Sequence, residues 1–301
     1  VDLIIKKKIS KLEINENKVN KRGKITAVIP VRKGSTRCRN KNFRDFGDTN
    51  LLKLKIETLK KVKDIDKILV SSNCDIMLGI AKDMGVDIHK RDEKYCTSEC
   101  SGSDLYIALA NAIESDLLLM TFCVTPFISV ETYINTINKY RNNKCDSIST
   151  VYNFKHYLWY NNKPINHDYS NAPPTQNLPD YFVPSFGIHL TDKYSVFENK
   201  NVISKCPIFE IVDEVECIDI DTPYEYLISE LLHNNNINSS ETCNFILNNR
   251  KPYKKLELLD CTIRDGGYIN NWNFTDKEIV ECYKSVSEAG YDYFEIGFRT
   301  N

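Results

Sequence analysis

Long apolar runs and CxxC cysteine pairs are both missing from this chain of 301 residues. Its longest apolar stretch, DLLLMTFCVTPFI at 116–128, is shorter than the roughly 18 apolar residues of a membrane-spanning helix, and Pro126 interrupts it. None of the 11 cysteines forms a CxxC pair, which argues against a structural zinc site and favours a reducing, cytoplasmic compartment. A net charge of -1 gives the molecule no general attraction for nucleic acid. We therefore expect neither a membrane nor a nucleic-acid partner.

Two common phosphate-binding patterns are also absent, the dinucleotide fingerprint GxGxxG and the Walker loop GxxxxGK[ST]. A different kind of basic loop is present in AVIPVRKGSTRCRNKN at 27–42, where it follows an apolar stretch that predicts a buried strand. The loop gathers five cationic side chains: Arg32, Lys33, Arg37, Arg39 and Lys41.

The composition of this loop suits an anion. Gly34 and Ser35 allow a turn whose backbone N–H groups can point at one site. Arg32, Arg37 and Lys41 add full charges that match phosphate oxygens. A solvated basic turn is the alternative interpretation, and the position of the loop directly after a buried strand weighs against it.

Predicted strands and helices alternate along most of the chain. Strands are expected at 24–30, 66–72, 86–91, 116–123, 146–154, 186–192, 207–212 and 217–221, and helices at 50–63, 74–85, 102–115, 129–143 and 222–235. This order predicts an α/β fold of three layers, in which helices cover both faces of a mostly parallel sheet. Ligands of such sheets bind at the carboxyl ends of the strands. Ser129 is expected to cap the helix that follows it.

Four segments make up the predicted domain organisation. Residues 1–23 form a polar linker or tail, 24–235 one large domain, 236–254 an asparagine-rich linker, and 255–301 a second unit. Within the large domain, the irregular stretch 155–184 is expected to form a projecting arm or a lid. The second unit has the pattern of one βαβ segment, which is too short to bury a core alone. We therefore expect the chain to be part of a longer polypeptide.

The basic loop resembles the nucleotide-binding signature of the acylneuraminate cytidylyltransferases, which make CMP-sialic acid and related CMP-sugars. That signature runs roughly Ile-Pro-Ala-Arg-x-Gly-Ser, then five residues, then Lys-Asn. The residues that match it at the same spacing are Arg32, Gly34, Ser35, Lys41 and Asn42.

Further segments are similar to the same family in the same order, over about 24–235. The segment 66–91 ends on Arg91, at the place of a family arginine. TPF at 125–127 and TQNLPDYF at 175–182 are similar to two further motifs. CIDIDTPYEY at 217–226 places Asp219 and Asp221 on the acidic pair of the family.

The resemblance implies the fold of the nucleotide-diphospho-sugar transferases and an attack of a sugar hydroxyl on the α-phosphorus of CTP, with release of pyrophosphate. It implies Arg32 and Lys41 as a triphosphate clamp and Asp219 with Asp221 as a Mg²⁺ site. The catalytic candidates are Arg32, Lys41 and Asp221. Without the resemblance, a strand-end turn with capping aspartates explains IDID equally well.

The resemblance also implies binding residues and partners. Nucleotide contacts are expected from Arg32, Gly34, Ser35, Arg37, Lys41, Asn42 and Arg91. Gln176 and His189 are candidates for the sugar side, although a structural histidine is as good an interpretation of His189. The implied partners are CTP, a small sugar and a second copy of the chain in a homodimer.

Departures from the family lie mainly on the sugar side. Phe122 replaces a glutamine, Ile128 and Thr175 replace arginines, and Asn73 replaces an aspartate. A lost arginine weakens the binding of a sugar acid, so we expect an acceptor other than ordinary N-acetylneuraminate. Two alternatives stay open: a nucleotidyltransferase of the same fold with another acceptor or nucleotide, and a catalytically idle nucleotide-binding scaffold.

The stretch LLDCTIRDGGYINNWNF at 258–274 resembles the start of the metal-dependent aldolase and lyase barrels, a group that includes hydroxymethylglutaryl-CoA lyase and 4-hydroxy-2-oxovalerate aldolase. Arg264 and Asp265 match its RDG, and Glu295 matches the glutamate that ends its second strand. The resemblance implies a truncated TIM barrel, and a divalent metal for the complete domain. We expect no lyase activity from these residues alone. A helix-strand appendage with a charged turn is the alternative.

Overall fold

The computed structural model describes residues 23–34, 37–249, 258–263, 265 and 273–295. The chain divides into two compact units, Val1–Asn244 and Phe245–Asn301. Among the described residues, no helix combines the length and the apolar character needed to cross a membrane.

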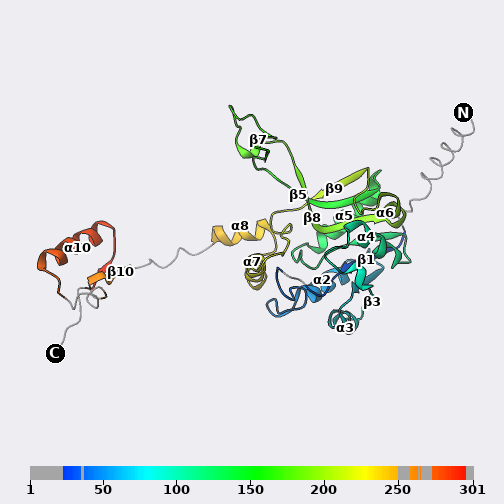
Figure 1. Ribbon diagram of the computed structural model, residues 1–301, viewed down its shortest axis with the longest axis horizontal. Helices are drawn as coiled ribbons and strands as arrows, with labels where there is room; N and C mark the ends of the chain where they lie inside the picture. Colours follow the sequence, from blue (N-terminus) through cyan, green and yellow to red (C-terminus); the bar gives the residue numbers. More distant parts are fainter. Residues whose placement is uncertain (1–22, 35–36, 250–257, 264, 266–272, 296–301) are drawn as a thin grey trace, which may run out of the picture. The chain divides into compact units, whose positions relative to one another are not determined.

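The first unit is built on a seven-stranded sheet with the order β3-β2-β1-β4-β8-β5-β9 (Figure 1). Its strands are β1 (Ile25–Pro30), β2 (Lys67–Ser72), β3 (Asp87–Lys90), β4 (Leu117–Met120), β5 (Ser147–Asn153), β8 (Phe182–Asp192) and β9 (Pro207–Ile211). Neighbouring strands are parallel except at β8, which runs antiparallel to both β4 and β5. The predicted α/β fold with a mostly parallel sheet is confirmed.

The described helices of the first unit are α2 (Leu51–Lys60), α3 (Asp75–Asp83), α4 (Gly102–Asn111), α5 (Val130–Asn142), α6 (Lys193–Asn199), α7 (Pro223–Asn234) and the beginning of α8 (Ser240–Asn249), with short 3-10 turns η1 (Glu93–Tyr95) and η2 (Thr175–Asn177). β1 is buried along its whole length, and its side chains alternate between two separate cores. Ile25, Ala27 and Ile29 pack with residues of α2, α3 and α5, whereas Val28 packs with residues of α4. Helices therefore cover both faces of the sheet.

Helix starts follow the capping rules. The predicted cap Ser129 accepts a hydrogen bond from Thr132 N at 3.1 Å, which confirms it. Asn50 caps α2 in the same way through Lys53 N at 2.9 Å. These two caps fix where α2 and α5 begin, on loops that follow β1 and β4.

Two predicted strands need correction, and the predicted linker contains a helix. The segment 217–221 is not a strand, because the turn before it, in which Asp213 accepts from Val215 N and Glu216 N, and the start of α7 leave no length for a ladder. β8 begins at Phe182 rather than at 186, because Phe182 still pairs with Asn153 of β5. The predicted linker 236–254 contains α8, whose first residue donates its N–H to Asp213.

The irregular stretch after β5 forms a projecting arm, as Figure 1 shows at β7. Its two short strands, β6 (Trp159–Tyr160) and β7 (Lys163–Pro164), pair antiparallel. Aromatic side chains are exposed on it, among them Tyr160 and Tyr169. Of the two predicted possibilities, arm or lid, the arm describes this segment.

The second unit contains β10 (Leu259–Asp260), α10 (Asp276–Glu288) and β11 (Tyr293–Phe294). β10 and β11 are parallel, and Thr275 with Glu278 forms a capping box at the start of α10. The described part of this unit has the predicted βαβ order, and it does not make a barrel.

Candidate active site

The basic loop follows β1 and turns at Gly34, whose φ of 89° lies in the left-handed region that favours glycine. Val31 N donates to Ser71 O at 3.0 Å, which ties the start of the loop to the end of β2. The Arg32 guanidinium donates to Cys96 O at 2.9 Å, so it also holds the segment after η1. Ser35, predicted to bind the nucleotide, lies outside the described residues.

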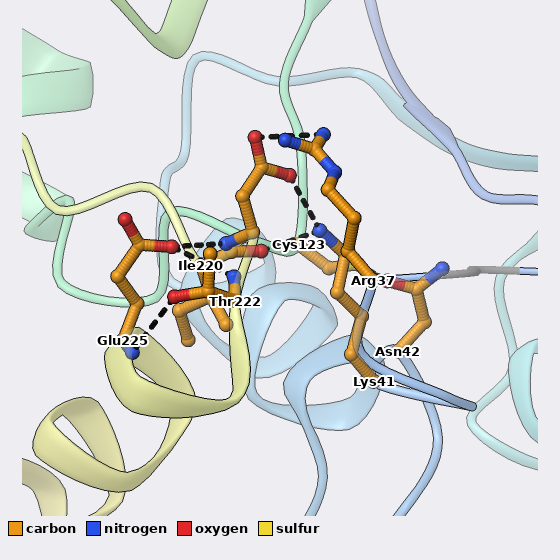
Figure 2. A network of polar contacts seen from close by, with 8 residues as sticks. Arg37, Lys41, Asn42, Cys123, Ile220, Thr222 and Glu225 are labelled. Atoms are coloured by element: carbon orange, nitrogen blue, oxygen red, sulfur yellow. Dashed lines mark hydrogen bonds and ion pairs between the residues drawn. The ribbon is translucent and has the colours of Figure 1, made fainter.

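Two cations of the loop meet one carboxylate of the segment before α7. The Lys41 ammonium lies 2.9 Å from Oδ1 of Asp221 and also donates to Ile220 O. Arg37 Nη2 lies 2.9 Å from Oδ2 of the same carboxylate. The two oxygens of the Asp221 carboxylate thus each contact one cation. Figure 2 shows the side chains of these cations, Arg37 and Lys41, with their contacts as dashed lines. The Lys41 side chain is 11% exposed and that of Arg37 66%, so screening by water weakens the Arg37 contact far more.

Asp221 is oriented by the helix that follows it. The Glu225 carboxylate accepts from both Asp221 N and Thr222 N at 2.8 Å, and Thr222 Oγ1 accepts from Glu225 N at 3.2 Å. This is a capping box, which satisfies backbone donors at the start of a helix. Our sequence reasoning missed Glu225, although the spacing T-P-Y-E at 222–225 carries the signal for it.

Asp219 has a carboxylate oxygen without a partner. Its Oδ1 is buried and accepts no hydrogen bond from any described residue. Burial and, after it, the negative charge of Asp221 raise the pKa of Asp219 to about 6. A buried, unpaired carboxylate oxygen beside a second carboxylate suits a hard divalent cation.

Two carboxylates are a partial set of metal ligands. Among the described residues, no cluster of three or more His, Cys, Asp or Glu side chains could hold a metal ion. Mg²⁺ fits such a sparse site, because it keeps several waters and takes further oxygens from substrate phosphates.

Arg91 is buried beside the loop with one part of its guanidinium unpaired. It is 4% exposed, donates from Nη2 to Val31 O at 2.7 Å and from Nε to the Cys96 thiol at 3.0 Å. Its Nη1 has no partner among the described residues. A buried cationic donor without an acceptor is costly, so this nitrogen suits an anionic or carbonyl oxygen of a ligand.

Asn42 joins the loop to the end of β4. Its side-chain oxygen accepts from the Cys123 thiol at 3.3 Å, and its backbone carbonyl accepts from Leu52 N at 3.0 Å. Burial raises the pKa of Cys123 to about 12, so the thiol stays protonated and keeps this donor role. Asn42 is itself 8% exposed, which makes it a wall of the site more than a free binding group.

One cavity of about 440 Å³ unites most of these groups. The predicted site residues that line it are Arg32, Arg37, Lys41, Asn42, Arg91, Asp219 and Asp221. Its remaining walls come from the end of β1, the loops after β3 and β4, Leu105 of α4 and Phe186 of β8. The cavity therefore lies at the carboxyl ends of β1, β3 and β4, where a doubly wound sheet binds its ligands.

Two predicted sugar-side residues do not line this cavity. His189 is 2% exposed and shares a hydrogen bond of 2.8 Å with Ser149, and burial lowers its pKa to about 4. Its register partner is Met120, so the alternation along β8 places it in the core on that face. Gln176 lies exposed in η2, on the arm. The structure thus favours the structural interpretation of His189.

A buried lysine near the site was also missed by our sequence reasoning. Lys55 is 1% exposed and donates to Thr125 O at 2.8 Å and Tyr133 OH at 3.1 Å, so it supports the loop after β4 from behind. Burial lowers its pKa to about 7. Its place four residues after Leu51, on the apolar face of α2, is the sequence signal that could have revealed it.

Residues of the second unit's predicted site are described in part. Glu295 N donates to Asp260 O at 2.8 Å, and the Cys261 thiol donates to the Glu295 carboxylate at 3.5 Å. Asp265 N donates to Cys261 O at 2.8 Å. Arg264 lies outside the described residues.

Comparisons with known proteins agree on the first unit. N-acylneuraminate cytidylyltransferase of Escherichia coli O18:K1:H7 is 25% identical over 221 residues, which are 68% of this chain and 51% of that enzyme, so the chain spans about half its length. Post-translational flagellin modification protein B of Campylobacter coli is 22% identical over 221 residues, 69% of this chain and 94% of that protein.

Two solved structures share the fold. 4-Diphosphocytidyl-2C-methyl-D-erythritol synthase of Anaerococcus prevotii superposes with a TM-score of 0.54 at 16% identity, over 71% of this chain and 97% of its own. CMP:2-keto-3-deoxy-manno-octonic acid synthetase, solved with CTP, gives a TM-score of 0.53 at 14% identity, over 71% of this chain and 99% of its own. The sequence pattern of the family described as Cytidylyltransferase matches residues 26–241, which is more than half of the chain. The chain therefore belongs to the cytidylyltransferase family of nucleotidyltransferases.

Proposed function

We propose that this chain transfers CMP from CTP to a hydroxyl of a keto sugar acid, sialic-acid-like or related, and releases pyrophosphate. The observation that carries the proposal is the pairing of Lys41 with Asp221 inside a cavity that Arg32, Arg91 and Asp219 also line. In the proposed reaction the acceptor oxygen bonds to the α-phosphorus while the bond from that phosphorus to the bridging oxygen of pyrophosphate breaks, and the hydroxyl loses its proton. The family membership and the E. coli relative support the same reaction class.

The cations of the basic loop hold the triphosphate in this proposal. Arg32 and Lys41 form the clamp, because full charges near the phosphoryl oxygens stabilise the charge that develops there. Lys41 and Arg37 are paired with Asp221. Phosphate oxygens compete with that carboxylate for the two cations, so the binding of the triphosphate frees Asp221 for a metal ligand role.

Asp219 and Asp221 are the proposed ligands of Mg²⁺. The unpartnered Oδ1 of Asp219 supports this assignment. When bound, the ion supplies positive charge to the phosphoryl oxygens. Glu225 contributes by holding the backbone of Asp221 in place.

The nucleoside is proposed to lie toward the loop after β3. Arg91 offers its unpaired Nη1 there, and Thr97 and Ser98 add hydroxyl groups to the same wall. Hydroxyl and guanidinium groups can read the hydrogen-bonding edge of a base or a ribose.

A nucleotide panel with detection of pyrophosphate tests the proposal. CTP, UTP, GTP and ATP are each incubated with Mg²⁺ and a set of keto sugar acids. Release with CTP supports the proposal, and release with another nucleotide favours a different nucleotidyltransferase of the same fold. Binding of CTP without release from any acceptor favours the idle scaffold.

The second unit and the assembly are further parts of the proposal. We infer that residues 24–235 form the cytidylyltransferase domain and that residues 255–301 begin a metal-dependent aldolase barrel. The parallel pairing of β10 with β11, with α10 between them in the chain, supports the second inference. We also infer a homodimer. A full-length polypeptide that cleaves or forms no keto acid in the presence of divalent metal ions would remove the aldolase assignment, and a monomer in sedimentation would remove the dimer.

A further inference from the structure

An aromatic pair forms one wall of the cavity. The rings of Phe122 and Phe186 meet edge to face, with centroids 5.8 Å apart and an interplanar angle of 90°. Both residues line the cavity, and Phe186 is 43% exposed. An aromatic side chain left this open in a cavity that charged side chains also line offers apolar contact to whatever binds there.

The backbone of Phe186 is held in a conformation that phenylalanine rarely adopts. Its φ of 54° lies in the left-handed region, which is costly for a bulky residue. The pairing of β8 with β5 is irregular at this place, between Ser149 and Val151. Strain of this kind persists where the surroundings impose it, and it gathers at functional sites.

Buried hydrogen bonds impose that conformation from both sides. Ser185 Oγ donates to Thr150 Oγ1 at 2.8 Å, and Ile188 N donates to the same oxygen at 2.9 Å. Thr121 Oγ1 donates to Gly187 O at 2.6 Å. A Cβ on Gly187 would lie 2.6 Å from the end of the Ile128 side chain and 2.9 Å from Thr150 Oγ1, so a larger residue would force these neighbours to shift. The Phe186 ring is thus fixed over the cavity.

Phe122 is fixed on the facing loop. Its carbonyl accepts from Thr125 Oγ1 at 2.9 Å, which closes a turn directly after β4. The next residue, Cys123, contacts Asn42, and Val124 O accepts from Ile220 N at 2.9 Å. The loop that carries Phe122 therefore adjoins the acidic pair.

The strand order indicates which side of the cavity faces the nucleoside and which faces the acceptor. β3 lies on one side of β1, and β4 with β8 lies on the other. The acidic pair, where transfer to the α-phosphorus takes place, adjoins the β4 loop. The hydroxyl groups that can read a base belong to the loop after β3. The acceptor then lies between the acidic pair and the aromatic rings.

We propose that Phe122 and Phe186 determine acceptor specificity by selecting a sugar acid that turns a deoxygenated or methyl-bearing segment toward them. This inference rests on the proposed function. A hydroxyl placed against two aromatic rings loses its water and gains no hydrogen bond, so a hydroxylated acceptor is disfavoured there.

The test uses two pairs of probes that differ in one oxygen: 2-keto-3-deoxy-manno-octonic acid with its 8-deoxy analogue, and N-acetylneuraminate with its 9-deoxy analogue. Phe186→Asn removes the ring and keeps a residue that tolerates the left-handed region. Phe182→Asn is the matched control, because Phe182 lies on the same strand, is 40% exposed and does not line the cavity. Binding of CTP with Mg²⁺ is measured by calorimetry, and kcat/KM for each acceptor by release of pyrophosphate.

In the unaltered chain we expect kcat/KM to favour the deoxy member of at least one pair by about tenfold, which corresponds to roughly 1.4 kcal/mol. Phe186→Asn should reduce that preference to within about twofold and leave CTP affinity unchanged, and Phe182→Asn should change neither. The inference is overturned if kcat/KM is equal for both members of each pair, if it favours the hydroxylated members, or if none of the four acceptors is turned over. A tenfold loss of CTP affinity in Phe186→Asn also overturns it, since the ring would then be a platform for the base. Absence of CTP binding in the unaltered chain would contradict the proposed function itself.

Discussion

Lys41 Nζ lies 2.9 Å from Asp221 Oδ1 although the two residues are 180 positions apart in the chain. The pair joins the loop after β1 to the segment before α7, and both residues line the cavity. Because the Lys41 side chain is only 11% exposed, its charge needs a partner in every state of the site. Asp221 is that partner here, and the triphosphate takes its place in our account.

Replacing Lys41 tests its proposed role in holding the triphosphate. Lys41→Met should lower the rate of pyrophosphate release at least about a hundredfold, because a fixed cation near the transferring phosphate is lost. CTP affinity should fall about tenfold, as expected for one charge-assisted contact. Arg39→Ala is the matched control: Arg39 belongs to the same loop, is exposed and does not line the cavity. Equal rates in the two variants would remove Lys41 from the site.

Asp219→Asn tests the proposed role of Asp219 as a metal ligand. The substitution keeps the shape and removes the negative charge, so the Mg²⁺ concentration for half-maximal activity should rise at least tenfold. Thermal stability should stay equal or increase, because a buried carboxylate without a partner disappears. The measurements are a Mg²⁺ titration of pyrophosphate release and a melting curve. An unchanged Mg²⁺ requirement contradicts the assignment.

Glu225 should act by holding Asp221 in position. Glu225→Ala removes the acceptor of Asp221 N and Thr222 N, which should cost about 1 kcal/mol of stability as a lost cap and lower kcat more than it raises KM for CTP. Glu225→Gln keeps an acceptor oxygen and should restore most of the stability and most of kcat. If the glutamine variant is as slow as the alanine variant, the carboxylate has a direct chemical role instead.

Lys55 should give the stability of the protein a specific pH dependence. Its pKa is about 7 in the fold against an ordinary value of 10.5, so between these values the unfolded chain holds a proton that the folded chain lacks. The contribution of Lys55 to the free energy of unfolding therefore rises with pH between these two values, with a slope of up to about 1.4 kcal/mol per pH unit. The difference in unfolding free energy between the natural chain and Lys55→Met, measured by urea titration at pH 7, 8 and 9, should therefore shift in favour of the natural chain. A difference independent of pH would show that Lys55 keeps its charge.

Much of the fold followed from the sequence because the parallel strands are continuous apolar runs. β1 and β4 are buried along their whole lengths, and such runs admit few other interpretations. The pattern IDID was misleading because alternation describes a strand only where a neighbour can pair with it. The turn at Asp213 and the start of α7 leave that segment no such length.

The charged part of the site was predictable and its supports were not. Lys41 and Asp221 belong to motifs that are read along the chain. Lys55 and Phe186 depend on tertiary contacts: one supports a loop after a distant strand, and the other is held by hydrogen bonds between β5 and β8. Helix α8 was overlooked because its polar asparagines outweighed the Ser239 cap, which accepts from Thr242 N at 3.2 Å.

The most direct measurement is the equilibrium binding of nucleoside triphosphates with Mg²⁺ to the natural chain and to Lys41→Met. We predict that CTP binds at least about tenfold more tightly than UTP, GTP or ATP, and that the substitution weakens the binding of CTP by a similar factor. Equal affinity of the two proteins for CTP, or no affinity in either, would contradict it.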